Sequence, residues 1–243
     1  MTLSAEGLDF KELNERIRSQ PGDVCIEACC GQRFIGSGFK EKNVTICGTP
    51  GNALGAYLDG AAIEVRGNVQ DAVGDTMNGG QIIVHGSAGD ALGYAMRGGR
   101  IFVRGNAGYR TGIHMKEYAP ANGPLKRPVI VVGGQVGSFL GEYLAGGIIV
   151  VLGIGCSGVP VGNFTGTGMH GGRIFIRTDT APAGLPEQVA AAVAGEEDLR
   201  DILPELHAFA AHFKLDVDPL VKGRYYVLKP NAKNPYQQLY TAN

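Results

Sequence analysis

The feature that most constrains this chain is a repeat of 19 residues. Glycines recur at that interval (67 − 48 = 19) and stand at Gly48, Gly67, Gly86 and Gly105. A short β-branched run precedes each of them, and a second glycine follows seven residues later, as Gly74 follows Gly67. A period near 20 residues is typical of stacked repeat proteins, whose units bury an apolar face only against one another.

The repeat predicts an all-β fold. No unit has room for a helix, and the leucine frame of a leucine-rich repeat is absent. Frequent glycines suit a chain that turns corners, because glycine adopts positive φ at little cost. We therefore predict a parallel β-helix of about seven coils, with strands centred near residues 45, 64, 83, 102, 131, 150 and 175.

The pattern divides the chain into three parts. We assign residues 1–22 to an N-terminal helix, residues 23–178 to the β-helix and residues 179–243 to a C-terminal helical segment and tail packed on the solenoid. Within the last part, the stretches 186–194 and 199–213 are predicted to be short helices. A loop inserted around residues 118–124 lengthens one coil.

Composition excludes several classes of protein. The chain holds 39 glycines in 243 residues, without the every-third spacing of collagen. A net charge of −1 argues against a nucleic-acid or anionic-membrane partner. No apolar run is long enough to span a membrane, and residues 1–10 lack the apolar region of a signal peptide. Five cysteines, an odd number, favour reduced thiols, so we expect a cytoplasmic protein.

One face of the predicted sheet is unusually apolar. If Ile63 and Val65 point inward, alternation sends Glu64 outward. The outward column then continues with Ile83, Phe102, Val131, Val150 and Phe175. Soluble proteins seldom leave such a ladder open, so either the C-terminal stripe of Leu199, Ile202, Leu206 and Phe213 or a partner protein should cover it.

Few residues suggest chemistry. The string G-x-G-x-x-G over residues 153–158 lacks the following helix of a dinucleotide site, so we predict no cofactor there. Cys25, Cys29 and Cys30 lack the second ligand pair of a zinc site, which favours buried structural thiols over a metal or cluster site.

The densest polar cluster leads into the inserted loop. Its members are Arg110, His114, Lys116 and Glu117. These side chains either lie in a solvated loop without a ligand or form a contact or binding site. We assign no catalytic, cofactor-binding or metal-binding residue.

The repeat G-N-x-x-D-x-x-G-x-x-M-x-G-G-x-I-x-V at residues 67–84 resembles the GXGXG domain at the C-terminus of the glutamate synthase large subunit. Segments 112–118, 141–147, 166–172 and 233–236 resemble its free-standing version. The same β-helix is related to the C-type subunit of formylmethanofuran dehydrogenase. The resemblance implies a right-handed β-helix that holds other catalytic parts together.

The resemblance also implies a function. It predicts a non-catalytic scaffold subunit of a glutamate synthase-like amidotransferase oxidoreductase, acting in glutamate biosynthesis and nitrogen assimilation. Its partners would be a class II glutaminase subunit and an FMN-binding synthase subunit that carries FMN and an iron–sulfur cluster, and a homo-oligomer is compatible with this interpretation. Family glutaminases use an N-terminal cysteine, whereas this chain begins Met1-Thr2, so we expect no glutaminase activity from the chain alone. Its cysteines do not form a cluster-binding run, so we also expect no cofactor in this chain.

Two alternatives stay open at this point. In one, the chain is a C-type subunit of a formylmethanofuran dehydrogenase-like complex. In the other, it is a stand-alone ligand-binding or enzymatic β-solenoid that uses the residues from Arg110 to Glu117.

Overall fold

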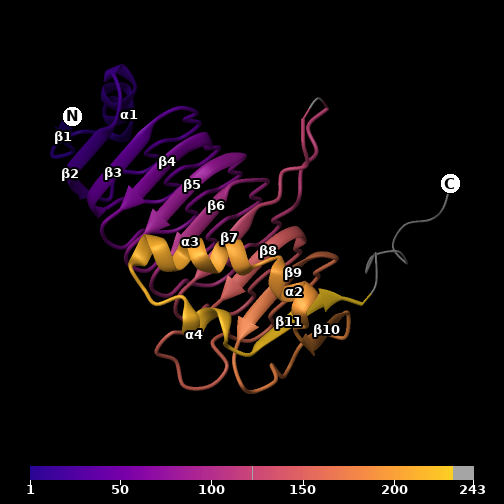
Figure 1. The fold of residues 1–243 in the computed structure, drawn as a ribbon. Coiled ribbons are helices and arrows are strands. Elements are labelled where there is room, and N and C mark those ends of the chain that lie inside the picture. Colours follow the sequence, from indigo (N-terminus) through magenta and orange to yellow (C-terminus); the bar gives the residue numbers. More distant parts are fainter. Residues whose placement is uncertain (122, 232–243) are drawn as a thin grey trace.

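A computed structural model describes residues 1–121 and 123–231. The segment 233–236 therefore lies outside the described residues. The described chain winds into a parallel β-helix, whose main sheet stacks strand on strand in chain order (Figure 1). Its eight parallel coil strands are β2 (Val24–Cys30), β3 (Asn43–Thr49), β4 (Asp59–Val65), β5 (Gly79–Val84), β6 (Arg100–Val103), β7 (Val129–Val132), β8 (Ala145–Val151) and β9 (Gly171–Arg177).

The solenoid begins one coil earlier than the repeat indicates. Strand β2 pairs in parallel with β3, and the short β1 (Thr2–Ser4) pairs in parallel with β2. The 19-residue glycine spacing starts only after β2, so the seven predicted strands omit β2, although the predicted β-helix of residues 23–178 contains it. Helix α1 (Phe10–Ser19) lies at this end, and Asp9 caps it by accepting the backbone N–H groups of Lys11 and Glu12.

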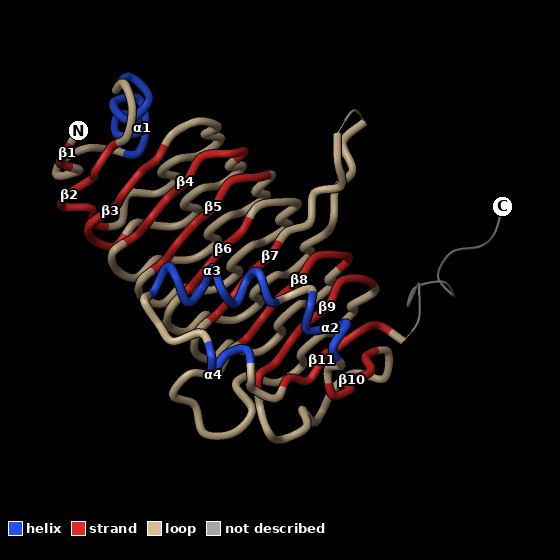
Figure 2. The backbone as a smooth tube through the Cα atoms, in the orientation of Figure 1, coloured by secondary structure: helices blue, strands red, loops and turns tan. Residues whose placement is uncertain are grey.

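The other end of the sheet closes differently. Strand β11 (Tyr225–Pro230) pairs antiparallel with β9, and β10 (Val189–Val193) pairs antiparallel with β11. The helix predicted over residues 186–194 is therefore wrong, because pairing at the sheet edge overrides the high helix propensity of alanine. Helices α2 (Glu196–Arg200), α3 (Leu203–Phe213) and α4 (Asp218–Val221) connect the two strands (Figure 2).

Aliphatic side chains fill the interior in columns that run along the solenoid. Ile82, Ile101 and Ile130 occupy paired positions on β5, β6 and β7, and all three are fully buried. The stretch opposite the strands contributes further apolar side chains, including Met77 and Met96. Burial of this kind is the main stabilising term of the fold.

Each coil turns back towards its strand through three residues of positive φ, at alternate positions. In one coil these are Ala91, Gly93 and Ala95. The middle residue is glycine for a steric reason as well, because a Cβ at Gly93 would lie 2.4 Å from Cδ1 of Ile130. The second glycine of the repeat is thus required by the isoleucine column that passes beside it.

Polar side chains of the repeat bond the coils to one another. The backbone N–H of Asp90 donates to Oδ1 of Asp71 (2.9 Å), and that of Tyr109 donates to Oδ1 of Asp90 (2.8 Å). Asn68 accepts the backbone N–H of Ser87 in the same way (2.8 Å). These bonds satisfy backbone donors at the corners and explain the Asn and Asp of the G-N-x-x-D pattern.

The outward apolar column is covered by the chain's own C-terminal segment. Helix α3 lies across the strands in Figure 1, and Phe102 and Phe175 are fully buried beneath the segment. They belong to a second apolar core together with Ile202, Leu206 and Phe209. Of the two covers expected from the sequence, the structure shows the C-terminal segment.

An ion pair fixes this cover at its edge. Nε of Arg100 on β6 donates to both carboxylate oxygens of Glu205 on α3, at 3.1 and 3.0 Å. Glu205 is buried, so this bifurcated, charge-assisted hydrogen bond also provides the partner that a buried charge requires.

Candidate interaction surface

The turns of positive φ form one flank of the solenoid, which we call the left-handed flank. Its first column, two residues before each middle glycine, contains Phe34, Ala53, Ala72, Ala91, Arg110, Phe139 and Phe164. Its third column, two residues after the glycine, contains Gly38, Tyr57, Thr76, Ala95, His114, Tyr143 and Gly168. Side chains larger than alanine are uncommon at such φ values, so the bulky residues stand out.

Aromatic side chains gather on the C-terminal half of this flank. The rings of Phe139 and Phe164 stack with centroids 5.0 Å apart, and those of His114 and Tyr143 stack at 5.0 Å with planes 8° apart. The spacing is close to the distance between neighbouring coils of a β-structure, about 4.8 Å. Phe164 remains 56% exposed, so the stack faces the surroundings.

Arg110 joins the aromatic stack. Its guanidinium lies 5.0 Å from the centre of the Phe139 ring, within the range of a cation–π contact. Its Nε also donates to Oε2 of Glu142 in the next coil (3.1 Å). The pair neutralises the cation and holds it against the aromatic surface.

The structure separates the polar cluster expected from the sequence. Arg110 and His114 both lie on the left-handed flank, but they contact different neighbours, Phe139 and Tyr143. Glu117 lies at the base of the inserted loop, where it accepts from Nε of Arg127 (2.7 Å). Lys116 is exposed beside it. The four side chains therefore do not converge on one ligand position.

The inserted loop leaves the solenoid as a hairpin-like excursion. Tyr118 and Lys126 form an antiparallel bridge, and the segment projects away from the stack of coils in Figure 1. Nζ of Lys126 reaches back to Oδ1 of Asp59 (3.1 Å), so the base of the excursion is tied to the coils.

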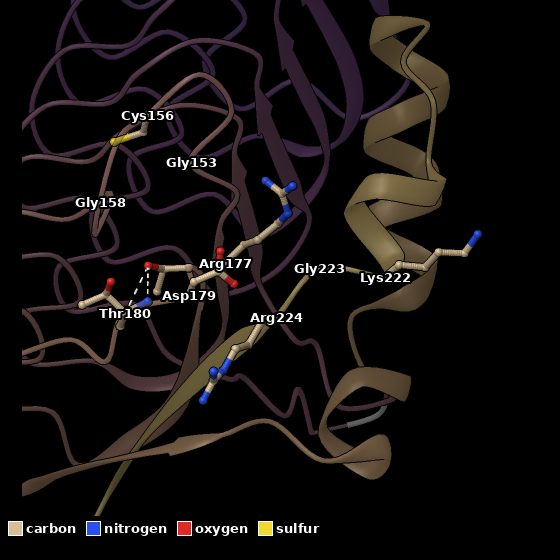
Figure 3. Close-up of a pocket in the computed structure, with 10 residues that line it drawn as sticks. Gly153, Cys156, Gly158, Arg177, Asp179, Thr180, Lys222, Gly223 and Arg224 are labelled. Atoms are coloured by element: carbon tan, nitrogen blue, oxygen red, sulfur yellow. Dashed lines mark hydrogen bonds between the residues drawn. The ribbon is translucent and has the colours of Figure 1, made fainter.

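A cavity at the C-terminal end has a volume of about 630 Å³. Gly153 and Gly158 of the G-x-G-x-x-G string line it, but a loop follows them rather than a helix. Its cations point in different directions in Figure 3, and Lys222 is paired with Asp218. The cavity therefore lacks the converging donors of a dinucleotide or phosphate site.

The cysteines have unequal surroundings. Cys29 is buried, and this burial raises the pKa of its thiol to about 11. Cys25 is half-buried and Cys30 is exposed, so the expectation of buried thiols holds for Cys29 alone of the three. In residues 1–121 and 123–231, no three His, Cys, Asp or Glu side chains gather in a way that could hold a metal ion.

Sequence reasoning missed most of the aromatic surface. Phe139 and Phe164 stand two residues before Gly141 and Gly166, which is the place of Arg110 before Gly112. That frame position is the signal that could have found them. Glu142, the partner of Arg110, carries no such signal because the contact spans two coils and the inserted loop.

Known proteins resemble this chain over most of its length. The family model described as "GXGXG motif" matches residues 17–217. Uncharacterized protein MJ1350 of Methanocaldococcus jannaschii is 43% identical over 256 residues, covering 99% of this chain and 96% of the relative.

A solved structure shares the fold. It is a chain of the formyltransferase/hydrolase complex (FhcABCD) from Methylorubrum extorquens in complex with methylofuran. The TM-score is 0.61 at 22% identity, with 84% of this chain and 72% of that chain covered.

No helix among the described residues is long and apolar enough to cross a membrane. By its sequence match and its β-helix, the chain belongs to the GXGXG motif family.

Proposed function

We propose that this chain is a non-catalytic scaffold subunit of a multi-subunit enzyme. One observation carries the proposal: Arg110 and Glu117 of the polar cluster are paired within the chain itself, while an aromatic flank stays exposed. Arg110, Glu117 and Lys126 each pair with a neighbouring coil or loop. A solenoid that exposes an aromatic surface, and whose polar cluster does not converge on one ligand position, suits a protein that holds other subunits together.

Two assemblies fit the proposal. The repeat motifs favour a glutamate synthase-like enzyme, in which partner subunits would supply the glutaminase and the FMN and iron–sulfur centres. The shared fold with a chain of the formyltransferase/hydrolase complex favours a formylmethanofuran dehydrogenase-like assembly. In both, the cofactors and the catalytic residues belong to the partners.

A stand-alone binding or enzymatic solenoid is the competing function. It would need Arg110, His114, Lys116 and Glu117 to act together on a ligand. The pairing of Arg110 with Glu142 and of Glu117 with Arg127 speaks against it, because each charge already has a partner of its own.

Purification of the tagged chain from its native host tests the proposal. We expect a stoichiometric complex that contains other polypeptides, which mass spectrometry can identify. A glutaminase and a flavoprotein would indicate the glutamate synthase-like enzyme, and subunits of a formylmethanofuran dehydrogenase would indicate the other assembly. The chain purified alone should release no ammonia from glutamine and carry no flavin or iron–sulfur absorbance. A monomeric chain without partners in the host, or a stoichiometric chromophore in the isolated chain, would refute the proposal.

A further inference from the structure

We infer that the C-terminal half of the left-handed flank is the surface on which a different protein subunit docks, and that this subunit presents apolar side chains bordered by lysine or arginine. The inference rests on the proposed scaffold function and gives it a location. The surface consists of Tyr94, Tyr109, Arg110, His114, Phe139, Tyr143 and Phe164, with Asp71 and Asp90 at its border.

Its exposed aromatic area is the first reason. Phe164 is 56% exposed, Tyr109 is 54% exposed and Tyr94 is 40% exposed. Soluble proteins rarely leave several large aromatic side chains exposed together unless the patch binds something. Tyrosine, phenylalanine and arginine are also enriched at the centres of protein interfaces.

Backbone conformation supplies an independent reason. Arg110, Phe139 and Phe164 have φ values of 59°, 63° and 60°, which favour glycine. The third column of the same flank does place glycine at such a φ in two coils, at Gly38 and Gly168. Bulky side chains held in strained backbone are found mainly where a functional surface requires them.

The charges around the patch define the partner. Arg110 is neutralised by Glu142, so the aromatic centre carries no net charge from this pair. Asp71 and Asp90 are exposed and lie one above the other in the coils next to Tyr109. A partner complementary to this pattern has an apolar centre and a cationic border facing these two carboxylates.

The chain offers variants that remove the surface without harming the fold. Phe164→Gly removes the most exposed ring and relieves the positive φ at that residue. Tyr57→Gly is the matched control, because Tyr57 has φ 57° and is 54% exposed but lies outside the patch. Asp71→Asn with Asp90→Asn removes the border charge and keeps the oxygen that accepts the backbone N–H, as Asn52 already does in that column.

The experiment uses the full-length tagged chain in its native host. A photo-reactive benzoylphenylalanine replaces Tyr109, and the same group at the exposed Val193 of β10 is the control. We expect position 109 to cross-link to one discrete polypeptide, at a peptide that contains apolar side chains and a lysine or arginine. Phe164→Gly should weaken recruitment of that polypeptide by about thirtyfold, as loss of a central interface residue does. The double Asp→Asn variant should weaken it about two- to fivefold and reduce its salt dependence.

Other results would overturn the inference. Cross-links from position 109 to a second copy of this chain would assign the surface to self-association. Equal losses in Phe164→Gly and Tyr57→Gly would trace the effect to the relaxed turn and not to the patch. Normal recruitment by Phe164→Gly, with cross-links from position 193 alone, would refute the location while leaving the scaffold function intact. A wild-type chain that recruits no polypeptide would refute both.

Discussion

The substitution Gly93→Ala tests how the solenoid is packed. Gly93 has φ +69°, and an added Cβ would lie 2.4 Å from Cδ1 of Ile130 and 3.4 Å from its Cγ1. Gly93 and Ile130 are both buried, and neighbouring coils hold the backbone on either side. The added methyl group therefore meets two penalties, one from the backbone conformation and one from the contact.

The magnitudes of the two penalties can be separated. Alanine in the left-handed region costs about 1–2 kcal/mol. Forcing a methyl group into a close-packed core costs about 1–3 kcal/mol more. Loss of conformational freedom in the unfolded chain returns about 0.4–1 kcal/mol. We expect Gly93→Ala to lower the free energy of unfolding by about 2–4 kcal/mol.

A matched control isolates the contact. Gly184 has φ +67°, and a Cβ there would meet no atom within 4 Å. Gly184→Ala should therefore show the conformational penalty less the same return from the unfolded chain, about 0–1.6 kcal/mol. The difference between the two variants measures the clash with Ile130.

Ile130→Val completes the test, because it removes the Cδ1 atom that the new methyl group meets. Alone it should cost about 0.5–1.5 kcal/mol, as a methyl deletion in a core does. The double variant should lose less stability than the sum of the two single variants, and the difference, which is the coupling energy, should be about 1–3 kcal/mol. Urea unfolding followed by far-ultraviolet circular dichroism measures the wild type and the four variants under one condition. Equal effects of the two alanine variants, or strictly additive costs in the double variant, would refute the steric explanation.

Three further predictions concern the cover and the thiols. Phe102→Ala should lower the free energy of unfolding by about 3–5 kcal/mol and expose α3 to protease, since Phe102 is fully buried beneath it; unchanged protease resistance would contradict this. Burial lowers the pKa of His212, which packs on Phe102, so the unfolded chain binds the proton more readily below about pH 6.5. The free energy of unfolding should therefore fall as the pH drops through that window, and urea titrations at several pH values should show a smaller fall for His212→Phe. At pH 8, iodoacetamide should modify the exposed Cys30 in the native protein and spare Cys29, whose thiol is buried and has a raised pKa; peptide mass spectrometry would detect the opposite order.

The limits of sequence reasoning are clearest where the repeat stops. Residues 186–194 are rich in alanine and look helical, yet Val189–Val193 is a strand because β11 offers it a pairing edge. The predicted β-helix of residues 23–178 contains β2, but the seven predicted strands omit it because Cys29, and not a glycine, stands 19 residues before Gly48. Both errors come from long-range pairing, which local propensity does not encode.

The same distinction applies to the candidate surface. The sequence groups Arg110, His114, Lys116 and Glu117 only by their polarity and their closeness along the chain. In the solenoid, residues one coil apart are neighbours, so Arg110 meets Phe139 and Glu142 across the inserted loop. A contact between coils is invisible to any window of consecutive residues.

The sequence by itself determined the stacked architecture, the glycine corners and the apolar outward column. A fixed period imposes the same interior position on every coil, so one repeat predicts the rest. Only the tertiary structure decided that α3 covers that column, that Arg100 and Glu205 fasten it, and that the aromatic rings of the left-handed flank stack outside the core. These contacts join residues of different coils, or a coil and the C-terminal segment, which lie far apart in the sequence. They are therefore set by packing in three dimensions.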